Sequence, residues 1–334
     1  MAGIDGWKLR QLHVASRLRP NIPATLSPAS AGDAHNWRVF HFWTMRYDKP
    51  ALTFDEQLAL LQQRGLHVPD TARARHWLQR VSYYRLSAYF LPFKHGELFR
   101  AGTDFDDVAG LYVFDRKLRL LVLDAIERIE VAMRTAVTYE VGHRFGAFGH
   151  TDPANFSPHF EHTKFMIELD TEERRARETF AAHFRSKYRS ETHLPVWMAT
   201  ELLSFGTISQ LYASLSPDIK RAIAGEYGVP DLHFASWLHT LSYTRNLCAH
   251  HKRLWSRQFA IRPKLPSRSR LWPHEIPDSG KVYAVLLIVR HMLRTVAPRC
   301  HWRDRLLALI DDHAAVPIAA MGMPKDWRGT AIWR

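Results

Sequence analysis

From Leu111 to Gly142 the chain reads LYVFDRKLRLLVLDAIERIEVAMRTAVTYEVG, in which apolar residues recur every three or four positions. The apolar stripe consists of Leu118, Val122, Ala125, Ile129 and Ala132. Because an α-helix has 3.6 residues per turn, this spacing places the five side chains on one face. The stretch therefore predicts a long helix that packs its apolar face into the core of a helical protein.

Helical patterns dominate from Thr53 onward. Thr53 and Glu56 have the spacing of a capping box, and Gly65 supplies a stop for the first helix. Further helices are expected in TARARHWLQRVSYYRLSAYFLPF (ending near Pro92), FMIELDTEERRARETFAAHFRSKY, VWMATELLSFGTISQLYASL, DIKRAIAGEYG, DLHFASWLHTLSYTRNLCAHH, KVYAVLLIVRHMLRTV and DRLLALIDDH. A short strand pair is expected near Leu91–Phe99. We predict a mainly α protein, with an N-terminal helical region at 45–100 and a larger helical domain at 101–334.

The first 44 residues differ from the rest of the chain. The segment RLRPNIPATLSPASAGDAHNW is rich in Pro, Ala, Ser and Gly and lacks helical periodicity, so residues 1–44 are expected to form a mobile arm. No apolar stretch typical of a secretory signal follows the first charges. Met45 is an alternative start, in which case residues 1–44 would be an artefact of the gene model.

The chain is strongly basic, with a formal net charge of +13 among 334 residues. Such a charge favours a polyanionic partner, most simply nucleic acid, although a basic protein without such a partner remains an alternative. No segment has the roughly 20 consecutive apolar residues of a membrane span, so no membrane partner is expected. Two cysteines cannot build a disulfide framework or a four-cysteine zinc site, so we expect reduced thiols, a cytoplasmic location and no cofactor.

The segment SYTRNLCAHHKRLW, Ser242–Trp255, places Arg245 five residues before His250. This spacing alone means little, because similar pairs occur elsewhere: Arg144/His150, Arg177/His183, Arg268/His274 and Arg294/His301. Only Arg245 and His250 follow a strong amphipathic stripe (Leu238, Leu241, Cys248) and precede a dense cationic segment. Context therefore selects this pair as the candidate site.

Arginine and histidine suit the cleavage of RNA by its own 2′-hydroxyl group. A histidine can take the 2′-hydroxyl proton or supply one to the leaving 5′-oxygen, and an arginine can bind the phosphoryl oxygens as negative charge develops. DNA lacks the 2′-hydroxyl and would not react in this way. The alternative is that the HHKR segment only complements the negative end of the helix dipole.

The helical spacing within the motif has two consequences. Asn246 and His250 lie about 40° apart around a helix, so the amide could orient the imidazole. Arg245 and His250 diverge by about 140° on a straight helix. Either the helix is distorted, or a second chain completes the site. We favour a homodimer in which two motifs meet across a twofold axis.

Two charged residues of the long stretch are candidate supporting residues. Glu130 could hold the tautomer of the catalytic histidine and Arg134, one turn later, could contact phosphate. A structural ion pair between them is the alternative. His251 could be a second acid or base, because no partner at zinc-ligand spacing accompanies it.

Further residues are candidates for RNA binding. Lys252, Arg253 and Arg257 follow the motif and could neutralise phosphates that flank the cut. Tyr84 and Arg85 could form a stacking platform for unpaired bases. Aromatic residues at this spacing are also typical of a core.

Taken together, the segments resemble abortive-infection proteins of the AbiD/AbiF type. The resemblance rests on YDKPALTFDEQLALLQQRGL, ARHWLQRVSYYRLSAYFLPF, LYVFDRKLRLLVLDAIERIEVAMR, LPVWMATELLSFGTISQLY, SWLHTLSYTRNLCAHHKRLWSR and MGMPKDW. It extends from about Tyr47 to Trp333 and omits residues 1–44, in agreement with a start at Met45.

The resemblance implies membership of the HEPN superfamily, hence a HEPN-like helical bundle with an N-terminal helical extension. It also implies a metal-independent endoribonuclease toxin of phage defence, with Arg245 and His250 as the catalytic pair. Lys252 stands where the family usually has serine, and Ser256 where it has asparagine; both changes could alter RNA contacts. The alternatives are a non-catalytic RNA-binding module, held by a small regulatory RNA, and a helical scaffold that senses a phage protein.

Overall fold

The computed structural model of the chain describes residues 49–266, 271–273 and 278–334. The predicted arm at residues 1–44 and the alternative start at Met45 lie outside these ranges. Contacts within the chain group residues 52–334 into one compact unit, to which the following description applies.

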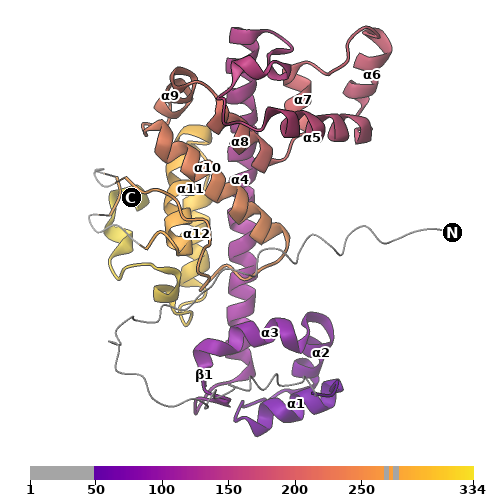
Figure 1. Ribbon diagram of the computed structural model, residues 1–334. Helices are drawn as coiled ribbons and strands as arrows, with labels where there is room; N and C mark the ends of the chain where they lie inside the picture. Colours follow the sequence, from indigo (N-terminus) through magenta and orange to yellow (C-terminus); the bar gives the residue numbers. More distant parts are fainter. Residues whose placement is uncertain (1–48, 267–270, 274–277) are drawn as a thin grey trace, which may run out of the picture. The chain divides into compact units, whose positions relative to one another are not determined.

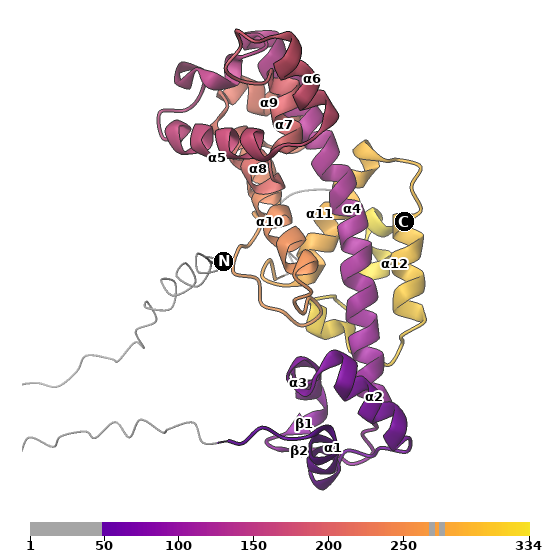
Figure 2. The same ribbon diagram turned by 90° about the vertical axis from the view of Figure 1, so that its right-hand side faces the viewer.

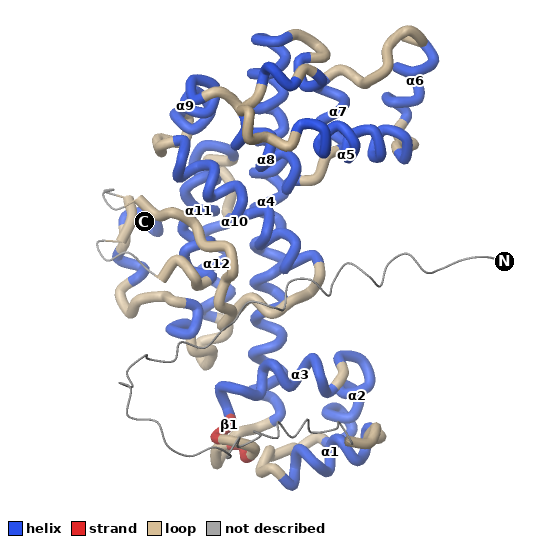
Figure 3. The backbone as a smooth tube through the Cα atoms, in the orientation of Figure 1, coloured by secondary structure: helices blue, strands red, loops and turns tan. Residues whose placement is uncertain are grey.

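The described residues are mostly helical (Figures 1 and 3). The α-helices are α1 (Phe54–Gln63), α2 (Thr71–Val81), α3 (Tyr83–Phe90), α4 (Phe105–Phe145), α5 (His162–Arg175), α6 (Thr179–Lys187), α7 (Val196–Leu202), α8 (Phe205–Ser214), α9 (Pro217–Gly225), α10 (Asp231–Ala249), α11 (Val282–Val296) and α12 (Trp302–Asp311). Short 3-10 helices are η1 (Leu91–Phe93), η2 (Gly149–Thr151), η3 (Pro153–Asn155), η4 (Ile318–Met321), η5 (Trp327–Gly329) and η6 (Ala331–Trp333). The strands are β1 (Lys94–His95) and β2 (Leu98–Phe99). The predicted mainly α class is confirmed.

Local signals in the sequence place several of these elements. Thr53 and Glu56 form the predicted capping box, in which the Glu56 carboxylate accepts from the Thr53 amide at 2.6 Å. Gly65 follows α1 with φ 88°, a conformation that favours glycine. The predicted strand pair is the antiparallel hairpin β1–β2, which turns at Gly96 with φ 61°. The capping box, the glycine stop and the strand pair are confirmed.

Three predicted helices are each divided in two. The segment after Thr71 breaks at Ser82, which has φ 71° and whose hydroxyl accepts from the Arg85 amide at 3.3 Å. The segment from 165 to 188 breaks between α5 and α6, and the segment from 196 to 215 breaks before Ser204. The Ser204 hydroxyl accepts from the Thr207 amide at 3.1 Å. At Ser82 and Ser204, predicting single helices was wrong because serine can satisfy the first amides of a new helix. The break between α5 and α6 has no such cap, because the Glu178 side chain forms no capping hydrogen bond there.

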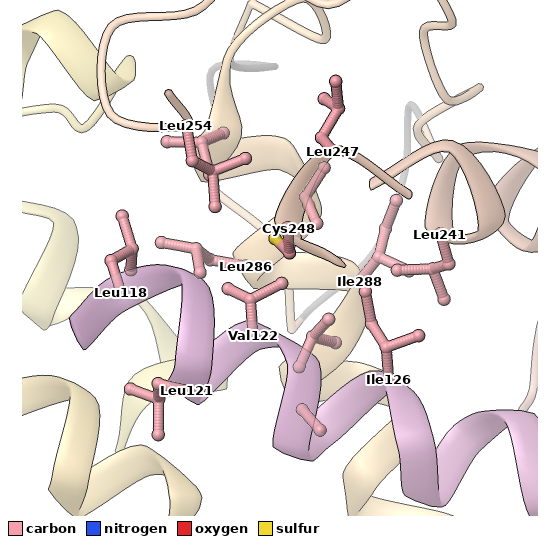
Figure 4. Packing of buried hydrophobic residues seen from close by; sticks show 14 of the residues in the cluster. Leu118, Leu121, Val122, Ile126, Leu241, Leu247, Cys248, Leu254, Leu286 and Ile288 are labelled. Carbon is pink, nitrogen blue, oxygen red and sulfur yellow. The ribbon is translucent and has the colours of Figure 1, made fainter. Parts of the chain in front are cut away.

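Helix α4 is the element on which the other helices pack (Figures 1 and 2). It contacts α3, α7, α8, α9, α10, α11 and α12. Its predicted stripe is buried as far as Ile129, whereas Ala132 is half-buried and the buried residue beside it is Met133. Figure 4 shows Val122 of α4 near Leu286 of α11 and Cys248 of α10. This packing fixes the C-terminal half of α10, which carries the motif, against the middle of α4.

Candidate functional site

The motif lies where α10 ends. His250 is the capping residue after Ala249, and His251 follows with φ 55°. The His251 amide donates to the Cys248 carbonyl at 3.0 Å, and the Lys252 amide donates to the Leu247 carbonyl at 2.9 Å. This pair of bonds is a Schellman motif, in which glycine usually occupies the left-handed position. Histidine there costs about 1 kcal/mol, so the surrounding structure must stabilise this turn.

Helix α3 holds the segment that follows the motif. The Arg85 guanidinium donates to the His251 carbonyl at 2.8 Å. In return, the Arg253 guanidinium donates to the carbonyl of Ala88. These two arginines connect α3 and the turn in both directions, and they fix the backbone on the C-terminal side of His250.

A buried carboxylate anchors the next residues. Asp115 of α4 is fully buried and accepts from the amides of Leu254 at 3.0 Å and Trp255 at 2.7 Å. The same carboxylate accepts from the Tyr89 hydroxyl at 2.6 Å and forms an ion pair with Arg119. Burial, followed by the Asp115 charge, raises the pKa of the Tyr89 phenol. The network connects α3, α4 and the residues after the motif.

Arg245 lies at a pocket between α10 and α4. Its side chain is 47% exposed, and its Nε is 3.9 Å from Oε2 of Glu130. Glu130 is mostly buried and accepts from Arg134 at 2.6 Å, and Arg134 also donates to the Leu203 carbonyl at 3.0 Å. The pocket has a volume of about 340 Å³ and is lined by Leu123, Glu127, Glu130, Val131, Arg134, Arg245 and Ala249. The Arg245–Glu130 pair is weak, because its atoms are 3.9 Å apart and the arginine is about half exposed, so Arg245 can still bind an anion.

The predicted supporting pair, Glu130 and Arg134, is therefore an ion pair that also reaches Arg245. The structure brings these three side chains together, which matches the alternative of an ion pair between Glu130 and Arg134. The carboxylate of Glu130 lies beside Arg134 and Arg245, and within the described part of the chain it forms no hydrogen bond or ion pair with His250.

His250 is exposed to solvent. Its amide donates to the Asn246 carbonyl at 3.0 Å, but its imidazole forms no hydrogen bond with any described residue. The expected contact between the Asn246 amide and the imidazole is absent, because His250 is the capping residue (φ −88°, ψ 15°) and not part of a regular helix. His250 does not line the Arg245 pocket. A single chain thus presents the arginine and the histidine separately.

The residues predicted to bind RNA fall into two groups. Lys252 is exposed and Tyr84 is 88% exposed, as is the predicted supporting residue His251. Arg85 and Arg253 are exposed and half-buried respectively, but their guanidinium groups bind backbone carbonyls. The second group therefore has a structural role in addition to any contact with RNA.

Arg257 is half-buried, and its Nε has no hydrogen-bond partner among the described residues. The platform predicted around Tyr84 is divided as well. Tyr83 packs edge-on against Phe90, with ring centroids 5.7 Å apart, and only Tyr84 remains free to stack.

Sequence reasoning missed the buried network of Asp115, Arg119 and Tyr89. A signal was present, because Asp115 and Arg119 interrupt the apolar face of LYVFDRKLRL at the spacing of one helical turn. Charged residues on a buried face are rare unless they are paired. Their partners, the amides of Leu254 and Trp255, follow about 140 positions later and could not be inferred locally.

The thiol of Cys248 is buried, and burial raises its pKa to about 12. Such a thiol is a poor nucleophile at neutral pH. Across residues 49–266, 271–273 and 278–334, no cluster of three or more His, Cys, Asp or Glu side chains could hold a metal ion. In the same ranges, no helix is both long enough and apolar enough to cross a membrane.

These features define a helical protein with a solvent-exposed arginine and histidine at the end of a helix that packs on a long central helix. The sequence model of the Abi-like protein family matches residues 76–256, which include α3, α4 and the motif. Because the match covers more than half of the chain, the chain belongs to the Abi-like protein family, and this membership supports a role in abortive infection. No curated protein and no solved structure matches the chain.

Proposed function

We propose that this protein is an endoribonuclease of anti-phage abortive infection, with Arg245 and His250 as its catalytic pair. The observation that carries the proposal is the exposure of both side chains at the C-terminal end of α10, next to a turn that a buried network fixes. Exposed groups can reach an RNA phosphate, and a fixed backbone keeps them in one geometry.

The proposed reaction removes a proton from the attacking 2′-hydroxyl group and supplies a proton to the leaving 5′-oxygen. The 2′-oxygen attacks the adjacent phosphorus while a histidine takes the 2′-hydroxyl proton. The bond from phosphorus to the 5′-oxygen then breaks, and a protonated histidine supplies the proton to that oxygen. The products are a 2′,3′-cyclic phosphate and a 5′-hydroxyl, and Arg245 stabilises the negative charge on the phosphoryl oxygens in the transition state.

A second copy of the chain completes the proposed site. One chain separates the His250 imidazole from the Arg245 pocket, and the reaction needs both a base and an acid. Two motifs related by a twofold axis supply two arginines and two histidines around one phosphate. We therefore expect the active species to be a dimer.

The test is cleavage of RNA by the purified chain in the presence of EDTA. The expected products carry 2′,3′-cyclic phosphate ends, and Arg245→Ala or His250→Ala should each abolish cleavage. Arg177→Ala and His183→Ala are matched controls, because both residues are exposed on or beside α6 and their side chains form no hydrogen bond with described residues. Cleavage that persists in both motif variants would refute the catalytic assignment.

A non-catalytic RNA-binding module is the second candidate. It is favoured by one observation, namely that the His250 imidazole does not line the pocket of Arg245. This alternative predicts RNA that co-purifies intact, binding that weakens steeply with salt, and no new RNA ends.

A further inference from the structure

A second pocket lies on α4, directly beyond the Arg245 pocket. It has a volume of about 540 Å³ and is lined by Thr135, Thr138, Tyr139, Gly142 and His143 of α4 and by Trp197 and Glu201 of α7. Trp197 and Glu201 are four residues apart, so they share one face of α7. A pocket of this volume has room for a small planar ligand.

Exposed aromatic rings border this pocket. Tyr139 is 59% exposed and Trp197 is 49% exposed. The ring of Tyr139 lies against that of His143, with centroids 4.0 Å apart. A Cβ added at Gly142 would lie 3.9 Å from the Trp197 ring. A larger side chain at this position would therefore fill the space beside the indole. The rings thus offer flat apolar faces to a ligand.

The same pocket has hydrogen-bonding groups without partners. The His143 Nδ1 donates to the Tyr139 carbonyl at 2.8 Å, which leaves Nε2 of the neutral ring as an acceptor. The Tyr139 hydroxyl, the Trp197 Nε1 and the Glu201 carboxylate form no hydrogen bond or ion pair with the residues that the structure describes. A few polar groups among aromatic rings are typical of a site for a small ligand.

Arg134 connects the two pockets. It lines the pocket of Arg245, and it donates to the carbonyl of Leu203 at the end of α7, the helix that carries Trp197. Along α4, Glu130 and Tyr139 are separated by about 14 Å at 1.5 Å per residue. A strand of a few nucleotides spans this distance, so an RNA bound at Arg245 can reach the second pocket.

We propose that the pocket of Tyr139, Trp197 and Glu201 binds one unpaired nucleobase of the RNA strand, with guanine preferred. This inference rests on the proposed action on RNA and adds a site that selects sequence. Tyr139 and Trp197 stack on the base. The Glu201 carboxylate accepts the N1 and N2 hydrogens of guanine together, whereas uracil has one N–H on that edge. A protein partner that packed on this pocket would have to bury the Glu201 charge, which is costly, so a nucleobase is the favoured ligand.

The test uses binding, so that it is separate from catalysis. Fluorescence anisotropy is measured with 2′-O-methyl hexamers of uridine that carry one central guanosine, adenosine, cytidine or uridine. The guanosine hexamer should bind most tightly to the full chain. Trp197→Ala or Tyr139→Ala should weaken its binding at least about fivefold, because each removes a stacking face. Glu201→Gln should remove the guanosine preference and leave the all-uridine hexamer unchanged.

Controls distinguish this proposal from its alternatives. Trp197→Phe should retain binding, because it keeps an aromatic ring. Leu232→Ala should also retain binding, because the Leu232 side chain on α10 is 59% exposed and lies outside the pocket. Unchanged base preference in Trp197→Ala, Tyr139→Ala and Glu201→Gln would overturn the inference, even if Arg245 and His250 prove catalytic. A change of oligomeric state on gel filtration with unchanged RNA binding would also overturn it, and would assign the face to a second copy. A preference for guanosine without any RNA cleavage would contradict the proposed ribonuclease activity and support the proposed nucleobase pocket.

Discussion

Replacing Asp115 by alanine should destabilise the protein more than the loss of any surface ion pair. Asp115 is fully buried and accepts from the amides of Leu254 and Trp255 and from the Tyr89 hydroxyl. The substitution also removes the partner of Arg119, whose side chain is only 5% exposed. It therefore leaves one buried cation and two backbone amides without an acceptor.

The magnitude follows from these lost interactions. Removing one member of a buried ion pair costs about 3–5 kcal/mol, because the remaining charge is uncompensated. Each unsatisfied amide would cost about 1–3 kcal/mol if it stayed buried. These contributions overlap, since water can enter the space, so we expect the free energy of unfolding to fall by roughly 4 kcal/mol. Asp115→Asn keeps an acceptor and should cost about half as much.

The measurement is urea unfolding followed by far-UV circular dichroism. Asp124→Ala is the control, because Asp124 forms partly exposed ion pairs with Arg128 and Arg305 and should cost less than about 1 kcal/mol. If Asp115→Ala costs no more than Asp124→Ala, the network does not hold the motif in place, and that result would falsify the reasoning.

Two further predictions concern other histidines. Burial, followed by the charges of His193 and His162, lowers the pKa of His150 from 6.5 to about 4. The folded protein therefore binds fewer protons than the unfolded chain between these values, so stability is complete above pH 6.5 and falls by roughly 3 kcal/mol as the pH drops to 4. Unfolding of His150→Phe followed against pH should lack this slope, whereas a slope equal to that of the wild type contradicts the assignment. His251→Gly should raise the free energy of unfolding by about 1 kcal/mol, because glycine adopts φ 55° without strain. The same variant should retain RNA cleavage if His250 alone transfers protons, and a loss of cleavage would assign a chemical role to His251.

Local patterns were sufficient to predict much of the fold. The apolar stripe of α4, the capping box at Thr53 and the strand pair near Leu91–Phe99 depend on neighbours within a few residues. The capping box and the strand pair are confirmed, and the stripe is confirmed as far as Ile129. The breaks at Ser82 and Ser204 were missed, because a serine inside an amphipathic segment can either continue a helix or cap a new one. The division near residue 100 and the HEPN placement remain predictions.

The candidate site shows where local reasoning ends. The residue types at Arg245 and His250, and the cationic segment after them, were evident from the sequence. The contact of Arg245 with Glu130 and the bond from Arg85 to His251 join residues more than 100 positions apart.

The sequence by itself thus determined the helices and the chemical groups of the motif, because helix periodicity and capping act over a few residues. Only the tertiary structure decided the left-handed turn at His251, the burial of Asp115 and the contact of Arg245 with Glu130. The physical reason is that hydrogen bonds, ion pairs and burial depend on which distant segments pack together, and helical spacing does not encode those partners.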